Sequence, residues 1–267
     1  WLTPGWTSYN KRLQYQAYDV TELLQSGQNV VGVMLGNGWY RSVLGWRNHG
    51  NIYGKNLGLL LQINITYNDG SSEQVVTDGN WKSSTGEIVF SQLYDGEIIN
   101  ASKEKTGWKT TGYDERNWEK VKIADYPKNN IIPTVNESVK KHETIKPLKI
   151  ITTPKGEKVI DFGQNLVGWV AVKLRGKQGD TITISHAEVL DKKGNFYTEN
   201  LRAAKAQMKY ILKGEAEESF YPHFSWMGFR FIKVDGYNGD LNPNDFEAVA
   251  LYSAMEPTGS FTSSNKM

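Results

Sequence analysis

The sequence lacks cysteine, long apolar runs and an excess of either charge. Because none of its 267 residues is a cysteine, disulfide bonds and cysteine-based zinc or thiol chemistry are excluded, although the compartment is not fixed. No apolar stretch reaches the roughly 18 residues of a membrane-spanning helix, so no membrane partner is predicted. The 31 basic and 29 acidic residues are spread without long runs, and they give no electrostatic footprint for nucleic acid.

The sequence also has no motif typical of metal, nucleotide or catalytic-triad chemistry. General acid–base catalysis commonly uses carboxylates. The 29 acidic residues supply candidate pairs in any fold, so composition selects none of them.

Strand signals dominate what is present. The 26 glycines and the aromatic content of 12% favour a turn-rich β protein. In the first half, β-rich runs at residues 30–35, 58–67 and 74–77 predict strands. The dipeptide Asp69-Gly70 predicts a hairpin between the last two of them.

The second half predicts short strands at regular spacing, without a long helical pattern. Between the halves, residues 113–147 are polar and rich in proline and asparagine, which predicts a linker. We therefore predict an all-β fold with two tandem β-sandwich or jelly-roll domains, at residues 1–125 and 148–264, joined by a linker at 126–147. The strands predicted in the second half are 158–162, 168–174, 181–186, 208–212, 229–234 and 246–252.

Eight short motifs in fixed order carry a resemblance to a known family. The first half has Tyr18-Asp-Val-Thr21, Leu35-Gly-Asn-Gly-Trp-Tyr-Arg41, Tyr53-Gly54, Thr77-Asp-Gly-Asn-Trp-Lys82 and Tyr94-Asp-Gly-Glu97, and the second half has Asp161-Phe-Gly-Gln-Asn165, His186-Ala-Glu188 and Gly228-Phe-Arg230. Together they resemble the β domains ahead of the catalytic domain in bacterial α-L-rhamnosidases of glycoside hydrolase family 78. The first of these domains is a galactose-binding-like jelly roll, and the second is another β-sandwich.

The resemblance implies a parent enzyme that removes terminal α-L-rhamnose from glycosides by inverting hydrolysis. It places the general acid and base on a helical barrel beyond Met267, so no catalytic residue is predicted in this chain. The chain is expected to be an inactive accessory region whose earliest strands are missing. The expected partners are L-rhamnose-containing glycans and that barrel. A periplasmic or extracellular location suits glycan foraging, while a cytoplasmic one stays open.

The segment from Asn37 to Arg41, followed by Trp46, is the candidate carbohydrate site. A flat aromatic ring such as Trp39 or Trp46 can cover the apolar face of a sugar, while Asn37 and Arg41 supply donors for its hydroxyls. The alternative is a core role, because strand alternation would turn either Trp39 or Tyr40 into the sandwich.

Asp95, Glu97 and Asn100 form the candidate metal site. Oxygen-bearing side chains on a turn are ligands of the kind calcium uses, and some family members hold L-rhamnose with calcium through carbohydrate-binding module family 67. Calcium is therefore the one cofactor considered. In the structural alternative, Asp95 shapes the turn while Glu97 caps a backbone amide. Asn100 replaces a carboxylate common in the family, which weakens a metal or sugar site.

The motifs of the second half favour architecture over chemistry. Asp161 begins a predicted turn in which Gly163 takes the unusual backbone angles. His186 and Glu188 could be an acid–base pair, but they share a strand face, and an interdomain hydrogen bond is the favoured interpretation. Arg230 is expected to pair with a carboxylate at that interface, such as Glu188.

Two other classes of function stay open. One is a calcium-dependent rhamnose-binding module that acts without the barrel. The other is a purely structural scaffold with no sugar binding and an exposed apolar patch, which could make the chain dimerise or aggregate. A related enzyme that acts on another deoxy sugar also stays open.

Overall fold

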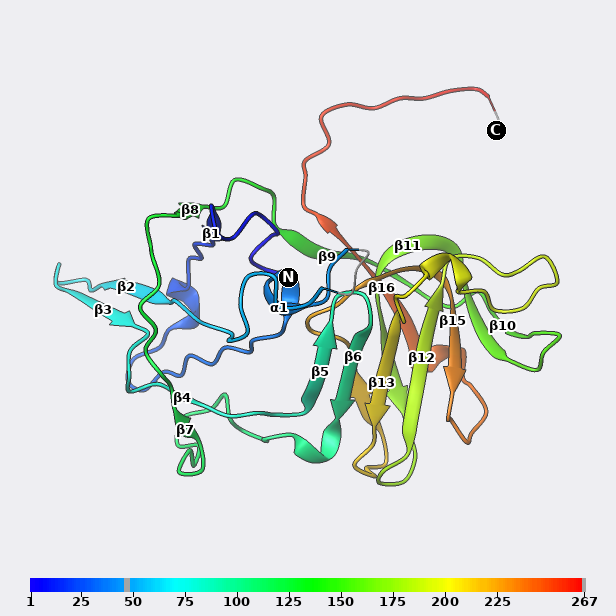
Figure 1. The fold of residues 1–267 in the computed structure, drawn as a ribbon, viewed down its shortest axis with the longest axis horizontal. Helices are drawn as coiled ribbons and strands as arrows, with labels where there is room; N and C mark the ends of the chain where they lie inside the picture. Colours follow the sequence, from blue (N-terminus) through cyan, green and yellow to red (C-terminus); the bar gives the residue numbers. More distant parts are fainter. Residues whose placement is uncertain (46–48, 266–267) are drawn as a thin grey trace.

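A computed structural model describes residues 1–45 and 49–265, which form an almost entirely β protein (Figure 1). The predicted all-β class is thus confirmed. The strands are β1 (Leu13–Tyr15), β2 (Gln62–Thr66), β3 (Ser72–Val76), β4 (Lys82–Ser83), β5 (Ile88–Gln92), β6 (Gly96–Asn100), β7 (Glu119–Lys120), β8 (Ile131–Pro133), β9 (Val139–Ile145), β10 (Lys149–Thr152), β11 (Lys158–Leu174), β12 (Thr181–Ala187), β13 (Gln207–Ile211), β14 (Glu218–Phe220), β15 (Met227–Asp235) and β16 (Phe246–Ser253). The helical turns are α1 (Gly38–Arg41) and the 3-10 turns η1 (Thr21–Leu23), η2 (Ala101–Lys103), η3 (Glu199–Leu201) and η4 (Pro243–Asp245). None of the helices in the described ranges has the length and apolar character needed to cross a membrane.

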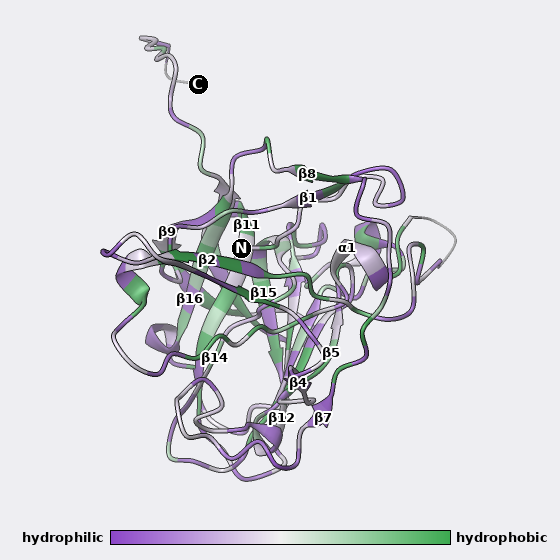
Figure 2. Cartoon of the chain, turned by 90° about the vertical axis from the view of Figure 1, so that its left-hand side faces the viewer, coloured by the Kyte–Doolittle hydropathy of each residue, from purple (hydrophilic) through white to green (hydrophobic). Residues whose placement is uncertain are grey.

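One ten-stranded sheet organises the molecule. Its strands run in the order β5-β6-β13-β12-β15-β11-β16-β9, with β10 and β14 paired to other stretches of β11. Strand β11 is 17 residues long, and this length lets it pair with β15, β16, β10 and β14. Hydrophobic residues concentrate on the strands of this sheet, whereas the connections are mostly hydrophilic (Figure 2). The largest fully buried side chains of the main core are Tyr210, Phe229, Phe246, Ile160, Leu174, Ile182, Ile184, Met208, Leu212 and Ile232.

The strands predicted in the second half are all present, and two of them merge. Residues 158–162 and 168–174 belong to the single strand β11, whose pairing with β15 shifts register between Asp161 and Leu166. Gly163 lies in this bulge with φ of +84°, an angle that glycine adopts without steric cost. The predicted turn is therefore a bulge within a continuous strand.

Two strands of the first half also belong to the large sheet. β6 pairs in parallel with β13, which places Glu97 opposite Met208, and β5 pairs with β6. A Cβ atom on Gly96 would lie 1.9 Å from the carbonyl oxygen of Gln207, so the close approach of the two strands requires glycine. The sheet takes strands from both sides of residues 126–147, while the domain boundaries at 125 and 148 stay predictions.

The predicted linker contains regular structure. β8 pairs in parallel with β1, and β9 forms an edge of the large sheet by pairing with β16. Five exposed residues of β9 lie between two half-buried ends. Polar and charged side chains are typical of edge strands, and they remove the hydrophobic alternation by which a strand is recognised.

Within the described residues, no strand forms at 30–35, so that prediction was wrong. In this segment the large apolar side chains of Val30, Val31, Val33, Met34 and Leu35 are 38–45% exposed. Strand propensity depends on packing against a neighbouring strand, and this segment pairs with none among the described residues. The hairpin between β2 and β3, in contrast, forms around Asp69-Gly70 as predicted.

Candidate carbohydrate-binding site

The candidate sugar segment forms the single helical turn α1, which is pinned to β5. The amide nitrogen of the Asn37 side chain donates to the carbonyl oxygen of Ser91 at 2.8 Å, and the Asn37 backbone N–H donates to the Ser91 hydroxyl at 3.2 Å. The backbone N–H of Arg41 then donates to the carbonyl oxygen of Asn37 at 2.9 Å, which closes the turn. Asn37 therefore positions the segment with the same amide group that was expected to contact sugar.

Trp39 belongs to a cluster of three tryptophans from distant parts of the chain. Its ring stacks on that of Trp6 with the centroids 4.8 Å apart and the planes 4° apart. The Trp226 ring meets Trp39 edge-on at 5.7 Å. The indole nitrogen of Trp6 donates to the Tyr53 hydroxyl at 3.0 Å, which fixes the orientation of the outer ring.

The outer ring of this stack is open to solvent. Trp39 covers one face of Trp6, and Trp6 remains 52% exposed. A flat, oriented and solvent-facing indole is suited to the apolar face of a sugar ring. We call the stacked pair Trp6 and Trp39, with Trp226 at its edge, the tryptophan platform.

Tyr40 belongs to a second aromatic group. Its ring lies 6.4 Å from that of Tyr9 and 6.3 Å from that of Tyr53. Its hydroxyl fills the space where Gly54 has no side chain, because a Cβ atom there would lie 2.0 Å away. Burial, together with the neighbouring Tyr126, raises the pKa of Tyr40 above 10.0. The expectation from strand alternation was wrong because α1 is a helical turn, and Tyr40 packs against tyrosines while Trp39 joins the platform.

Arg41 is exposed and forms no ion pair with any other described residue. It follows Trp39 by two residues, which is about 200° around a helical turn, so the two side chains point to different sides. Trp46, the last member of the predicted sugar set, lies outside the described residues. The structure thus brings Trp39 together with Trp6 and Trp226, and it does not bring Arg41 to them.

Sequence reasoning missed Trp6 and Trp226 as members of the site. They lie 33 positions before and 187 positions after Trp39, so no spacing rule connects them. The one signal was the abundance of tryptophan, nine in 267 residues, which predicts aromatic clusters but not their members.

The three candidate metal ligands turn to three different partners. The Asn100 side-chain oxygen accepts from the backbone N–H of Ser102 at 3.1 Å, and an Asp95 carboxylate oxygen accepts from that of Lys205 at 3.3 Å. Glu97 and Asn100 are three residues apart on β6, so they lie on opposite faces of the strand. Among the described residues, no group of three acidic or histidine side chains could hold a metal ion. The arrangement does not fit calcium at this turn.

Glu97 is held inside the protein by a loop of the second half. Its carboxylate accepts from the backbone N–H groups of His223 and Phe224 and from the hydroxyl of Ser225, at distances between 2.6 and 3.1 Å. Burial raises the pKa of Glu97 above 4.5, and these hydrogen bonds oppose the rise. Glu97 therefore caps backbone amides, as the structural alternative predicts.

The motifs of the second half form an ion pair and a buried histidine. Arg230 binds Asp161 with two bonds, Nε–Oδ1 at 2.8 Å and Nη2–Oδ2 at 3.0 Å. Arg230 pairs with a carboxylate as expected, but the partner is Asp161 on the adjacent strand. Glu188, the suggested partner, instead accepts from Asn165 at 3.1 Å. Arg230 lowers the pKa of Asp161 below 3.8.

His186 is fully buried and does not pair with Glu188. Its Nδ1 lies 2.9 Å from the carbonyl oxygen of Ala206 in the loop before β13, and its ring meets that of Phe229 edge-on at 5.0 Å. Ala206, like His186, belongs to the second half of the chain. The predicted interdomain hydrogen bond was therefore wrong, because the bond lies within one half. Burial lowers the pKa of His186 to about 4, so the ring is neutral at pH 7.

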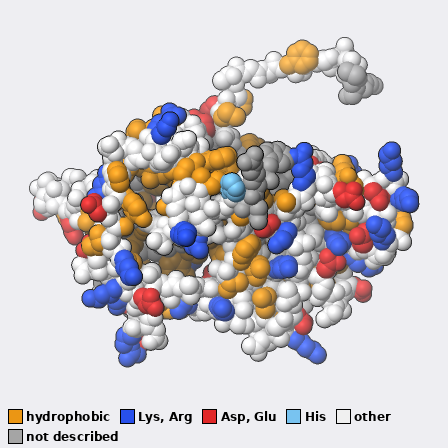
Figure 3. Space-filling model, in the orientation of Figure 1, with side chains coloured by type: hydrophobic (Ala, Val, Ile, Leu, Met, Phe, Trp, Pro, Cys, Tyr) orange, Lys and Arg blue, Asp and Glu red, His pale blue; other side chains and the backbone are white. Residues whose placement is uncertain are grey.

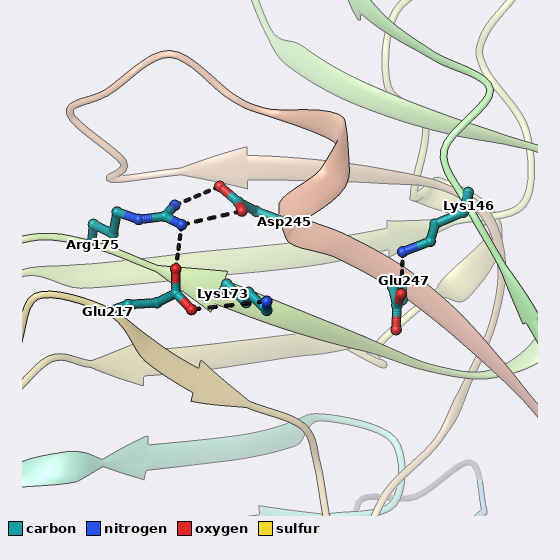
Figure 4. Close-up of polar contacts among 6 residues, drawn as sticks. All are labelled: Lys146, Lys173, Arg175, Glu217, Asp245 and Glu247. Carbon is teal, nitrogen blue, oxygen red and sulfur yellow. Dashed lines mark hydrogen bonds and ion pairs between the residues drawn. The ribbon is translucent and has the colours of Figure 1, made fainter.

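A separate cluster of charges lies on β11, on β16 and in the connections beside them (Figure 4). Arg175 donates to Asp245 at 2.6 Å and also pairs with Glu217. Because each carboxylate in the cluster faces a cation, the cluster offers no free acid–base pair. Its six members are Lys146, Lys173, Arg175, Glu217, Asp245 and Glu247.

The sequence matches two family models. One, described as the α-L-rhamnosidase N-terminal domain, matches residues 1–143. The other, described as the bacterial α-L-rhamnosidase concanavalin-like domain, matches residues 151–252.

Similar proteins cover nearly all of this chain. An α-L-rhamnosidase of Streptomyces avermitilis is 37% identical over 262 residues, which are 97% of this chain and 25% of that protein. The crystal structure of native α-L-rhamnosidase from Aspergillus terreus matches with a TM-score of 0.91 at 37% identity, over 98% of this chain and 31% of that one. The structure of the Streptomyces avermitilis enzyme complexed with L-rhamnose matches with a TM-score of 0.87 at 35% identity, over 94% of this chain and 24% of that one. The chain therefore spans between about a quarter and a third of the length of these proteins.

Proposed function

Because this chain belongs to the α-L-rhamnosidase family, we propose that it is the non-catalytic accessory region of a longer enzyme that removes terminal α-L-rhamnose from glycosides. The matching relatives are named α-L-rhamnosidases, and the chain corresponds to 25% of the length of the Streptomyces avermitilis protein. In this proposal, an inverting general acid and general base lie in the part of the parent enzyme that this chain does not include.

The state of the buried acidic groups supports a non-catalytic role. Glu97 and Glu218 accept backbone N–H groups, and Asp161 and Asp245 face arginines. A general acid or base must reach the substrate, and these four carboxylates are committed to holding the fold. We expect the isolated chain to release no nitrophenol from p-nitrophenyl α-L-rhamnopyranoside, and release at an enzymatic rate would contradict the proposal.

We also propose that the tryptophan platform binds a sugar ring of the glycan. The observation that carries this is the 52% exposure of Trp6, whose ring is held by its stack on Trp39 and its bond to Tyr53. The ligand would place its apolar face on the indole, as sugars do on flat aromatic side chains.

Substitution of the outer ring tests this proposal. Titration of L-rhamnose, followed by tryptophan fluorescence, should saturate for the unmodified chain and weaken at least about tenfold in Trp6→Ala, since the apolar contact is lost. Tyr67→Ala is the matched control, because Tyr67 is also exposed but lies at the β2–β3 hairpin. Equal binding by the Trp6 variant and the unmodified chain would exclude the platform.

A second role, as a scaffold for the barrel, is favoured by a separate apolar surface. Figure 3 shows a hollow on the N-terminal half with hydrophobic side chains at its rim. Large hydrophobic side chains of that half are widely exposed, among them Leu35, Ile52, Leu60, Val76 and Ile123. Exposed patches of this kind mark surfaces that contact other protein. We expect self-association on gel filtration, and a monomer at high micromolar concentration would count against this role.

A further inference from the structure

Glu97 lies where the two halves of the chain meet. It is 1% exposed, and its strand β6 pairs in parallel with β13, so the backbone on which it stands is fixed by the large sheet. No described cation forms an ion pair with it. Its carboxylate accepts hydrogen bonds from a single loop of the second half.

That loop is held by one carboxylate through several donors. The Oε1 atom accepts from Phe224 N at 2.6 Å, from Ser225 Oγ at 2.9 Å and from His223 N at 3.0 Å. The Oε2 atom accepts from His223 N at 3.1 Å. Without Glu97, the two backbone N–H groups would lose their acceptor and the Ser225 hydroxyl would keep only the Met208 sulfur at 4.0 Å, which the loop would relieve by moving.

Two side chains at this loop contact the sugar segment or the residue that precedes it. The Phe224 ring lies over Gly36, where a Cβ atom would be 2.3 Å from the ring, and Gly36 directly precedes Asn37. Trp226 meets the ring of Trp39 at 5.7 Å. Trp226 also packs on the buried cluster around Trp169, so the loop joins the platform to the core of the sheet.

We propose that Glu97 is the positioning residue of the tryptophan platform: by fixing residues 223–225 it holds Trp226 against Trp39 and so keeps Trp39 beneath the exposed ring of Trp6. This inference rests on the proposed sugar-binding function of the platform for its consequence in binding. The structural link itself, from Glu97 through the loop to the stacked rings, stands separately and is tested separately.

Fluorine NMR of protein labelled with 5-fluorotryptophan measures the link directly. Each of the nine tryptophans gives one resonance, which is assigned by its loss in a Trp→Phe variant. In Glu97→Ala, the resonances of Trp6, Trp39 and Trp226 should shift. The resonance of Trp81, which is anchored to the Val76 carbonyl at 3.0 Å, should stay in place.

Glu218→Ala is the matched control. Glu218 is 5% exposed and also accepts three backbone N–H groups, from Lys213, Gly214 and Glu215, but its loop does not carry a platform residue. Both variants should lower the melting temperature, and only Glu97→Ala should move the platform resonances. A role of Glu97 in stability alone would leave those resonances unchanged in the folded protein.

Glu97→Gln replaces Glu97→Ala as the test variant if the alanine variant does not fold. The glutamine oxygen can keep the three bonds made by Oε1, but its NH2 group would face the His223 N–H at the position of Oε2. For Glu97→Gln we expect smaller resonance shifts in the same direction. Its affinity for rhamnose should lie between that of the unmodified chain and that of Glu97→Ala, and the affinity of Glu97→Ala should be weaker than that of the unmodified chain by about tenfold or more.

The two proposals fail in different ways. Platform resonances that keep their positions in Glu97→Ala, or in Glu97→Gln where alanine prevents folding, would overturn the positioning role of Glu97. If those resonances shift while the unmodified chain shows no saturable response to L-rhamnose, the positioning role stands and the sugar-binding function falls.

Discussion

Replacing Arg230, which pairs with Asp161, by alanine should lower the free energy of unfolding by more than the partial exposure of Arg230 suggests. The Asp161 side chain is 2% exposed and that of Arg230 is 38% exposed, so Arg230→Ala leaves a buried carboxylate without its cation. Breaking a buried pair in this way costs about 3–5 kcal/mol. Solvent screening reduces this value, and Gly163 N still donates to Asp161 at 2.7 Å, so we expect a loss of about 2 kcal/mol in the free energy of unfolding at pH 7.

Urea unfolding, followed by tryptophan fluorescence, measures this loss. The sharper test is the double variant Arg230→Ala with Asp161→Asn, because the amide removes the unpaired buried charge and keeps an acceptor for the Gly163 N–H group. The double variant should be more stable than Arg230→Ala alone. If Asp161→Asn instead adds a further loss in that background, the unpaired carboxylate is not the source of the destabilisation.

The same pair has a predictable pH dependence. Arg230 lowers the pKa of Asp161 below 3.8, so its stabilisation is fully present above 3.8 and is lost as the pH falls through the lowered pKa. The difference in stability between the unmodified chain and Arg230→Ala should therefore shrink in this acidic range. A difference that stays constant from pH 7 to pH 2 would contradict an electrostatic origin.

Three further perturbations have clear expected outcomes. Gly96→Ala should lower the unfolding free energy by more than about 2 kcal/mol, because its Cβ would meet the Gln207 carbonyl oxygen at 1.9 Å, whereas Gly58→Ala, in open space, should change thermal stability far less. His186 should make the folded protein less stable as the pH falls from 6.5 to about 4, because in this range the unfolded chain binds a proton at His186 more readily than the folded protein does. His186→Gln should therefore flatten the pH profile of the melting temperature over that range. Leu60→Glu, at a side chain that is 62% exposed, should shift gel-filtration elution toward the monomer, and an unchanged elution volume would exclude its surface from self-association.

The strands of the second half were predictable because each is packed against other strands. In β12, for instance, Ile182 and Ile184 are fully buried, whereas Thr181 and Thr183 are more exposed. This alternation is visible in the sequence wherever one face of a strand is buried. Residues 30–35 carry a similar apolar composition, but composition does not say whether a partner strand lies alongside.

The site was only partly predictable because its contacts are long-range. The sequence indicated Trp39, and it could not indicate that Trp6 would stack on it, since ring stacking depends on how two distant segments pack. Glu97 was predicted as a metal ligand because a carboxylate on a turn is compatible with several roles. Its actual partners lie 126 to 128 positions further along the chain.

Calorimetric titration of L-rhamnose into the purified chain, first with calcium and then with chelator, tests the central claim most directly. The tryptophan platform predicts saturable heat that persists after chelation, because its contact is an aromatic ring and the described residues include no group of three or more histidine or acidic side chains that could hold a metal ion. A flat titration up to millimolar sugar, or heat that disappears with chelator, would contradict the account of the platform.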